Sequence, residues 1–329
     1  MRDAKIIGTG VYVPERIVTN AELSNNLGEN IDDFVTNVIG IRERRIAADN
    51  ESTADLATAA AENALHNAGI STAELDLILL TTDTPEYISP ATSVVVQHRI
   101  GAVNAGTFDI NCACAGFVTT LDAAFKYIIA DAGYKKVLVI GCYAMSKFMD
   151  WTDKKTSTIF ADGAGAVVLQ AVENEQHFLA SKLVADGKFH DYMGIFAGGT
   201  RQPVTAEIIA ENNTNRLRFV KKYPPEVNID GWPKIVSEVL AKAGLTTADI
   251  DMFLWTQVNI STINAVMQNM GVPAEKTHTI MQKWGYTGSA CIPMVFHDAI
   301  EAGRIKRGDR VIMCASGGGF NMACIAIKY

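Results

Sequence analysis

Two stretches of the chain repeat one another at a distance of 175 residues. Residues 68–81 read AGISTAELDLILLT and residues 243–256 read AGLTTADIDMFLWT, and the two align without a gap, with seven identical positions. An internal duplication explains this similarity. It restricts the possible folds to those built from two similar halves, and it predicts a division into residues 1–174 and residues 175–329.

Two further pairs of apolar stretches repeat at nearly the same distance. Residues 136–142 match residues 310–316, and residues 164–169 match residues 323–327. Short, almost continuous apolar runs are typical of strands that are covered on both faces, and here they alternate with amphipathic stretches. The pattern therefore predicts an α/β fold in which helices cover mostly parallel sheets.

The composition excludes several classes of protein. With 329 residues and 48% hydrophobic residues, the chain can bury a large core, and its net charge of -7 argues against nucleic-acid binding. Short basic runs such as residues 42–45 and 221–222 are expected to be solvated or, at most, to contact a phosphate. No segment resembles a signal peptide, and no uncharged apolar run reaches about 18 residues, so we expect a cytoplasmic protein outside the membrane.

The six cysteines show neither metal-binding spacing nor a disulfide framework, which predicts free thiols and no metal site. Cys114 lies within DINCACAGFVTT (109–120), between a short apolar run and a stretch with helical spacing that Gly133 ends. This pattern predicts a nucleophile at a strand-to-helix turn, where the helix dipole would lower the thiol pKa. Cysteine is also a common buried residue, and Cys112 is a rival nucleophile. The duplication pairs Cys114 with Ser289, so we expect an active site between the halves.

Several motifs together carry a resemblance to a known family. The chain contains GTGVYVPE, GIRER, ACAGF, FADGAG and GGGF, at residues 8–15, 40–44, 113–117, 160–165 and 317–320. This combination resembles the β-ketoacyl-acyl-carrier-protein synthase III group of the thiolase superfamily, and the likeness covers nearly the whole chain.

The resemblance implies a thiolase-like, five-layered αβαβα fold, a homodimer and no tightly bound cofactor. It implies that Cys114 takes an acyl group from a coenzyme A or phosphopantetheine thioester, the latter on acyl-carrier protein, before a decarboxylative condensation with malonyl-carrier protein. It also implies that the backbone N–H groups of Cys114 and Gly318 bind the thioester oxyanion.

The same comparison shows departures from the family pattern. The catalytic histidine of the family corresponds to Thr256 and its asparagine to Tyr286, because this chain reads TQVN at 256–259 and GYTG at 285–288. These two side chains stabilise the enolate in the family, so decarboxylation is expected to be impaired. The hydroxyls of Thr256 and Tyr286 and the amide of Gln257 can donate hydrogen bonds, or they can simply fill space. His278 is the histidine to examine for proximity.

Positions that contact the substrate in the family also differ. Phe34 replaces a tryptophan that stacks on the adenine of coenzyme A in the family. Lys154 keeps the positive charge of another nucleotide-contacting position, and Asn259 keeps the asparagine on the pantetheine side. Coenzyme A recognition should therefore be weaker, but a carrier protein could still present the same pantetheine arm. Ser89 replaces a bulky aromatic residue that reaches the acyl pocket of the opposite subunit, which predicts a roomier pocket.

Three functions remain open from the sequence. The chain could be a synthase III-type acyltransferase acting through Cys114 in fatty-acid-like or secondary-metabolite synthesis. It could be an ordinary 3-oxoacyl-acyl-carrier-protein synthase III, or a non-catalytic partner that forms a heterodimer with an active paralogue.

Overall fold

A five-stranded sheet forms the core of the first half. The structure is a computed structural model, and it describes residues 1–212, 215–224 and 226–329. In the sheet, β4 is parallel to its neighbours β5 and β6, whereas β7 is antiparallel to both β6 and β1. The strand order is β1 (Arg2–Tyr12), β7 (Asp162–Glu173), β6 (Lys136–Ala144), β4 (Leu77–Thr81), β5 (Gly106–Ile110).

A four-stranded sheet in the second half repeats this arrangement. Its order is β8 (Phe178–Ala185), β13 (Asn321–Lys328), β12 (Arg310–Gly317), β11 (Met252–Trp255), with β11 parallel to β12 and the other pairs antiparallel. Beside β11, where the first sheet has β5, a single bridge joins Phe253 to Thr277. The predicted division at 174/175 falls between β7 and β8, and it stays a prediction.

Both sheets are mixed, so the expectation of mostly parallel sheets was wrong. In the second half, β13 follows β12 after only three residues, and a connection that short can join only antiparallel strands. The strand composition gave no sign of this, since β7 and β13 are as apolar as the parallel strands beside them. The direction of a strand depends on its connection, which sequence patterning constrains weakly.

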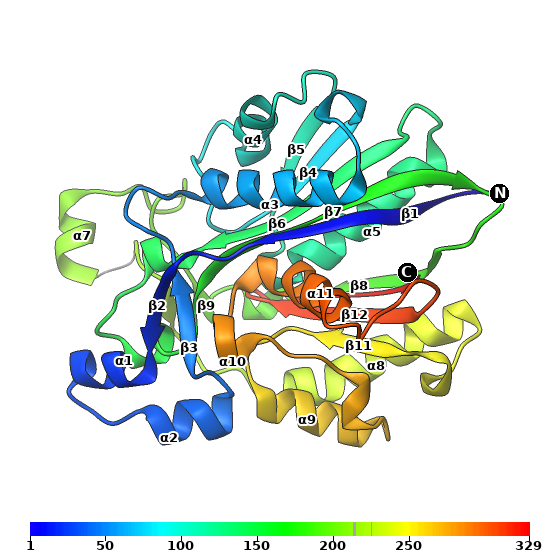
Figure 1. The fold of residues 1–329 in the computed structure, drawn as a ribbon. Helices are drawn as coiled ribbons and strands as arrows, with labels where there is room; N and C mark the ends of the chain where they lie inside the picture. Colours follow the sequence, from blue (N-terminus) through cyan, green and yellow to red (C-terminus); the bar gives the residue numbers. More distant parts are fainter. Residues whose placement is uncertain (213–214, 225) are drawn as a thin grey trace.

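Helices cover and separate the two sheets in five layers (Figure 1). On the outer face of the first sheet lie α3 (Thr53–Ala68) and α4 (Thr92–Ile100), and on that of the second lie α8 (Glu226–Ala243) and α9 (Ile260–Asn269). The middle layer is formed by α5 (Gly116–Ala130) and α11 (Cys291–Glu301), which contact both sheets. This αβαβα arrangement confirms the predicted fold class.

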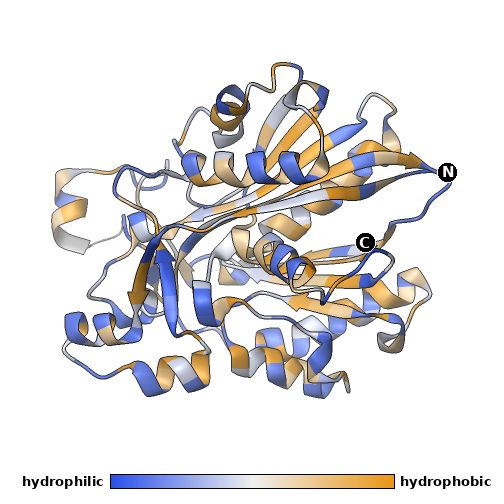
Figure 2. Cartoon of the chain, viewed as in Figure 1, coloured by the Kyte–Doolittle hydropathy of each residue, from blue (hydrophilic) through white to orange (hydrophobic). Residues whose placement is uncertain are grey.

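The hydropathy of the chain follows these layers. The strands and the faces of the helices that meet them are apolar, and polar residues gather on the outer helices (Figure 2). Residues Ala113–Ala130, which include α5, are apolar and long enough to cross a membrane by composition alone, but 61% of that window is buried inside the protein. The central helix of a layered α/β core passes the same test, so this stretch is weak evidence for a membrane span.

Smaller elements extend from the end of the sheets where the middle helices begin. They include the pairs β2 (Arg16–Thr19) with β3 (Glu43–Ile46) and β9 (Met193–Gly194) with β10 (Arg218–Phe219). The short helices are α1 (Asn20–Leu27), α2 (Asp32–Phe34), the π-helix η1 (Val35–Ile39), α6 (Lys154–Ser157), α7 (Ala206–Asn212) and α10 (Met281–Trp284). The 3-10 turns are η2 (Thr72–Glu74), η3 (Ala113–Ala115), η4 (Met145–Phe148), η5 (Gly187–Phe189), η6 (Thr247–Asp249), η7 (Ala274–Lys276) and η8 (Gly288–Ala290).

Candidate active site

Cys114 lies in the tight turn η3 between strand β5 and helix α5, as the sequence predicts. Ala113 has a φ of 46°, a left-handed conformation that a non-glycine residue rarely adopts outside tight turns. A Cβ atom at Gly116 would lie 1.9 Å from the Thr81 hydroxyl oxygen, so only glycine lets the helix start this close to β4. The local sequence therefore fixes a sharp, closely packed turn with the thiol at its apex.

The environment of the thiol differs from the sequence-based expectation. Cys114 is only 3% exposed, and this burial raises its pKa well above the ordinary thiol value. The Asp83 carboxylate raises the pKa further, and a hydrogen bond from the Tyr286 phenol lowers it. The predicted depression of the pKa by the helix dipole was wrong, because loss of hydration of a buried thiolate outweighs the field of one helix.

The loop between β12 and β13 packs directly against this turn. A Cβ atom at Gly317 would lie 2.6 Å from the Cys112 carbonyl oxygen and 2.8 Å from the Cys114 nitrogen. The backbone N–H of Gly319 donates to the Tyr223 hydroxyl oxygen at 3.2 Å, which holds the loop from its other side. The glycines of this loop thus allow two backbones from different halves of the chain to approach closely.

A cavity of about 270 Å³ joins the residues that the sequence singled out as catalytic. Its lining includes Cys114, Thr256, Tyr286, Gly318 and, on the outward side, Asn259. Asn259 caps the N-terminus of α9 by accepting from the backbone nitrogens of Ser261 and Thr262, so its amide oxygen is already engaged. Side chains from both halves of the duplication therefore share one cavity.

Thr256 and Tyr286 face this cavity with neutral hydroxyl groups. The Thr256 hydroxyl accepts from the backbone N–H of Ser316 at 2.9 Å, so its proton is available to donate. Tyr286 is 2% exposed, and burial raises its pKa well above the ordinary phenol value, which keeps it protonated. Its main chain is bound to Ile159 and Ala161, and this pairing directs the ring toward the interior.

Gln257 lies outside this cavity, contrary to its predicted role in substrate binding. Its amide nitrogen donates to the carbonyl oxygens of Trp255 at 3.1 Å and His278 at 3.4 Å, and its oxygen accepts from the Ile280 nitrogen at 3.0 Å. The bonds with His278 and Ile280 tie the end of β11 to the segment before α10, and the bond to Trp255 is local. The side chain thus has a structural role that a spacing argument could not reveal.

His278 does not take the place of a catalytic histidine. Its Nε2 atom pairs with the Asp298 carboxylate at 2.7 Å, on α11. No histidine is among the described residues that line the Cys114 cavity. Across residues 1–212, 215–224 and 226–329, no group of three or more His, Cys, Asp or Glu side chains could hold a metal ion.

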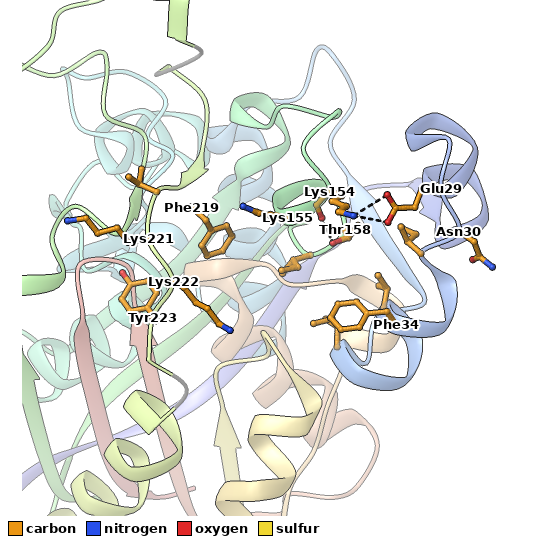
Figure 3. Close-up of a pocket in the computed structure, with 15 residues that line it drawn as sticks. Glu29, Asn30, Phe34, Lys154, Lys155, Thr158, Phe219, Lys221, Lys222 and Tyr223 are labelled. Carbon is orange, nitrogen blue, oxygen red and sulfur yellow. Dashed lines mark hydrogen bonds and ion pairs between the residues drawn. The ribbon is translucent and has the colours of Figure 1, made fainter.

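A second, outer cavity of about 680 Å³ opens beside the first (Figure 3). Phe34, 59% exposed, and Lys154, which pairs with Glu29 at 2.8 Å, both line it, and their predicted contacts with substrate stay predictions. The two cavities share four lining residues, and these mark a passage from the surface toward the thiol. The shared residues are Ile39, Ile159, Phe219 and Tyr223.

The outer cavity also contains cationic residues that the sequence did not single out as binding residues. Lys155, Lys221 and Lys222 lie with Lys154 around it, from segments far apart in the chain (Figure 3). The only sequence signal was the short basic pair at 221–222, which is common on solvated surfaces. The tertiary structure brings these dispersed lysines to one rim, where Lys154 pairs with Glu29 and Lys221 pairs with Asp191 at 2.6 Å. Lys155 and Lys222 are then the cations of the rim that can contact a phosphate or carboxylate group.

Ser89 lies apart from both cavities of the single chain. It is exposed, in the loop between β4 and α4, and its peptide bond to Pro90 is cis. Its predicted contact with the acyl pocket of an opposite subunit stays a prediction.

Comparison with known proteins now gives the family. Residues 108–187 match the model described as 3-oxoacyl-[acyl-carrier-protein (ACP)] synthase III, and residues 240–329 match the model of its C-terminal part. The β-ketoacyl-[acyl-carrier-protein] synthase III of Geobacillus kaustophilus (strain HTA426) is 38% identical, over 99% of both chains. The corresponding protein of Aquifex aeolicus (strain VF5) is 36% identical, again over 99% of both chains.

Solved structures that are similar to this chain point to the same family. The crystal structure of the Aquifex aeolicus VF5 enzyme superposes with a TM-score of 0.89 at 36% identity, covering 99% of this chain and 100% of that one. The priming β-ketosynthase of the R1128 polyketide pathway gives a TM-score of 0.90 at 27% identity, covering 99% of this chain and 96% of that one. The chain therefore belongs to the β-ketoacyl-acyl-carrier-protein synthase III family of acyltransferases.

Proposed function

We propose that this protein forms an acyl thioester on Cys114 and transfers the acyl group to an acceptor in fatty-acid-like or secondary-metabolite synthesis. The donor is an acyl-carrier protein or acyl-coenzyme A, and the protein works in the cytoplasm as a homodimer. The observation that carries the proposal is the shared cavity, in which a buried thiol meets the glycine loop of Gly317 and Gly318.

In the proposed first step the Cys114 sulfur attacks the donor carbonyl carbon. The carbonyl oxygen becomes an oxyanion, which the backbone N–H groups of Cys114 and Gly318 would stabilise. Collapse of this intermediate breaks the bond to the pantetheine sulfur, which leaves as a thiol with the proton that Cys114 has lost, and the acyl group stays on Cys114. The passage beside Phe219 and Tyr223 suits an extended arm that reaches inward from the lysine rim.

The positive rim of the outer cavity supports an anionic donor. Four lysines lie around this opening in a chain of net charge -7, and two of them are ion-paired, Lys154 with Glu29 and Lys221 with Asp191. Lys155 and Lys222, which have no carboxylate partner among the described residues, can attract the phosphates of coenzyme A or an acidic carrier protein. With Phe34 half-exposed in place of a stacking indole, we favour the carrier protein as the donor.

We further propose that malonyl decarboxylation is impaired, because Thr256 and Tyr286 stand where the family has histidine and asparagine. Their neutral hydroxyls can each donate one hydrogen bond, but neither supplies an imidazole. Removing one oxyanion donor lowers a rate about 10²- to 10³-fold. Under this proposal, the acyl acceptor is a nucleophile that can attack the acyl-enzyme without first being decarboxylated by this enzyme.

An ordinary 3-oxoacyl-acyl-carrier-protein synthase III is the second candidate. It is favoured by the full-length similarity to relatives that carry this name. A non-catalytic partner of an active paralogue is the third, favoured by the burial of Cys114.

Mass spectrometry of the intact protein separates these candidates. Incubation with acetyl-, medium-chain and aromatic acyl thioesters of coenzyme A and carrier protein should give an adduct that Cys114→Ala abolishes, while Cys112→Ala keeps it. No adduct with any donor would rule out the first two candidates and leave the non-catalytic partner. Release of labelled carbon dioxide from malonyl-carrier protein at a rate equal to that of an ordinary synthase would favour the second candidate over the first.

A further inference from the structure

Three polar residues that acylation of Cys114 does not use form one wall of the inner cavity. Asn228, Thr256 and Ser316 all line the cavity that contains Cys114. Asn228 belongs to helix α8, Thr256 directly follows strand β11, and Ser316 belongs to strand β12. Because these residues lie far apart in the chain, the sequence pointed only to Thr256, and the fold adds the other two.

Ser316 joins the other two residues of this wall. Its hydroxyl donates to the Asn228 Oδ1 atom at 2.8 Å, and its backbone N–H donates to the Thr256 hydroxyl oxygen at 2.9 Å. Both contacts use acceptor atoms, so the donors of the two side chains remain available. The Asn228 Nδ2 atom and the Thr256 hydroxyl proton have no partner among the residues that the structure describes. The wall therefore offers two neutral hydrogen-bond donors to a ligand.

The packing of α8 on the second sheet fixes this arrangement. The ring of Trp232, one turn after Asn228, stacks on the ring of Trp255 with their centroids 5.3 Å apart. Both tryptophans are completely buried, and Trp255 directly precedes Thr256. The first turns of α8 and the end of β11 are thus locked together by a close-packed contact. The two donors are held in place before a ligand enters, which lowers the entropic cost of binding.

The same cavity contains no ordinary base. Among the described residues that line it there is no aspartate, glutamate, histidine, lysine or arginine. Its ionisable groups are the thiol of Cys114 and the phenols of Tyr223 and Tyr286. An alcohol or an ammonium group has to give a proton to a base before or during attack on a thioester. A site with donors and no base instead suits an acceptor that is acidic enough to enolise by itself.

We propose that Asn228 and Thr256 bind an oxygen of a β-dicarbonyl acceptor, such as a β-ketoacyl thioester, and that Ser316 positions both side chains. This inference rests on the proposed function and names the class of its acyl acceptor. The carbon between two carbonyl groups forms an enol without a strong base, and hydrogen bonds to the oxygen stabilise the charge that develops there. Asn228 and Thr256 would touch the acceptor, whereas Ser316 acts through them.

The transfer step balances without an outside reagent. The central carbon of the enol attacks the carbonyl carbon of the acyl group on Cys114, and a carbon–carbon bond forms. The bond between that carbonyl carbon and the Cys114 sulfur then breaks, and the sulfur receives the proton that the enol loses. The products are a dicarbonyl compound acylated on carbon and the free thiol of Cys114.

A purely structural role for the polar wall leads to a different result. If the three residues only pack against one another, changing them alters every reaction of the acyl-enzyme to a similar extent. If they bind the acceptor oxygen, changing them slows transfer to a dicarbonyl compound far more than transfer to a compound that lacks the second ketone. The ratio of these two rates therefore separates the two roles.

The experiment compares acceptors that differ in one group. Cys114 is first acylated to completion with an acyl thioester that gives the adduct described above, and the excess donor is removed. Loss of the acyl group is then followed by mass spectrometry with acetoacetyl-N-acetylcysteamine or with β-hydroxybutyryl-N-acetylcysteamine, in which a hydroxyl replaces the ketone. Malonyl-N-acetylcysteamine is the third acceptor. Because the acyl-enzyme is prepared beforehand, these rates do not depend on the rate of acylation.

The variants Asn228→Leu and Ser316→Ala are compared with the wild type and with Ser237→Ala. Ser237 is an exposed residue of the same helix α8 and is not among the residues that line the Cys114 cavity, so it is a matched control. Circular dichroism verifies that each variant is folded. If Asn228→Leu does not fold, Ser316→Ala and the wild-type ratio carry the test.

We expect the wild type to transfer its acyl group to the acetoacetyl compound at least about 10²-fold faster than to the β-hydroxybutyryl compound. Asn228→Leu should lower the rate with the acetoacetyl compound about 10²-fold, and Ser316→Ala should lower it about 10-fold. In both variants the ratio between the two acceptors should fall, while Ser237→Ala should match the wild type.

Three results would overturn this inference alone. They are a wild-type ratio near one, faster transfer to the malonyl compound than to the acetoacetyl compound, and an unchanged ratio in the folded variants. Failure of every donor to give a Cys114 adduct in the first step would overturn the proposed function as well.

Discussion

At the scale of single residues, burial keeps the proposed nucleophile Cys114 in the neutral thiol form at rest. A helix N-terminus stabilises a nearby negative charge by about 0.3–1 kcal/mol, and burial without strong donors easily exceeds this. The thiolate must therefore be generated as the substrate arrives. This makes the groups that share the cavity with the sulfur, Tyr286 and Thr256, more important than the turn alone.

The positions of Thr256 and Tyr286 give a direct test of impaired decarboxylation. The double variant Thr256→His/Tyr286→Asn installs the histidine and asparagine that the family resemblance predicts for these two positions of the cavity, and loss of the phenol ring makes space for the imidazole. We expect carbon dioxide release from malonyl-carrier protein to rise at least about 10²-fold over the wild type.

Each single variant serves as a control for the double variant. Each should gain less than the pair, because residues that act as a unit are not additive. If a folded double variant releases carbon dioxide no faster than the wild type, the two replacements do not explain the difference from the family.

The carboxylate of Asp83, whose Oδ1 atom is buried without a hydrogen-bond partner among the described residues, predicts how stability depends on pH. Its pKa is raised from 3.8 to about 6 in the folded state, so ionisation opposes folding, and the stability that it removes is restored as pH falls through 6. Asp83→Asn should therefore increase the free energy of unfolding by up to about 3 kcal/mol at pH 8 and by about 1 kcal/mol at pH 4.5.

Urea denaturation at the two pH values measures this difference. A variant that is less stable than the wild type at pH 8 would contradict the prediction and would mean that the carboxylate has a partner.

At the scale of elements, the site depends on the contact between the nucleophile turn and the β12–β13 loop. Replacing Gly317 with alanine puts a Cβ atom 2.8 Å from the Cys114 nitrogen, where backbone cannot move cheaply. We expect Gly317→Ala to lower stability by about 1–3 kcal/mol and to displace the oxyanion-binding backbone. If Gly317→Ala remains folded, its rate of acylation should be lower than that of the wild type.

Gly187→Ala is the control for this prediction, because a Cβ atom there meets no other atom within 4 Å. Thermal unfolding and the mass-spectrometric acylation assay report the two effects separately. Acylation at the wild-type rate in Gly317→Ala would show that close approach of the loop is not needed for acyl transfer.

At the scale of the whole molecule, apolar surface near the first sheet supports the predicted homodimer. Ile88 is 85% exposed and Tyr87 55% exposed in the loop that also contains Ser89, and Val103 is 79% exposed after α4. Large exposed apolar side chains commonly mark an interaction surface. Covering this loop with a second subunit would also bring Ser89 toward the acyl pocket of that subunit.

We expect light scattering to give a mass of twice 35.5 kDa for the wild type. Ile88→Asp should shift the protein toward the monomer, because it puts a charge into the covered surface. Ile17→Asp is a control on β2, at an exposed apolar residue away from that loop. A wild-type monomer at micromolar concentration would contradict the predicted homodimer and the proposed contact of Ser89.

Much of the architecture could be predicted from the sequence alone. The repeat at 68–81 and 243–256 determined that the halves are alike, and it did so correctly because η2 with β4 and η6 with β11 lie at the same spacing. The turn at Cys114 was also predictable, since small residues and helical periodicity are local signals. The expectation of mostly parallel sheets failed, because the directions of β1, β7, β8 and β13 depend on connections and long-range pairing.

The chemistry of the site depended on the tertiary structure. The sequence determined that a thiol stands at the start of a helix between two duplicated halves, because local residues specify a turn. Only the folded chain decided that this thiol is desolvated, that Gln257 is engaged in backbone contacts and that four lysines gather at one opening. Burial and electrostatic contact arise between segments far apart in the chain, so no local pattern encodes them.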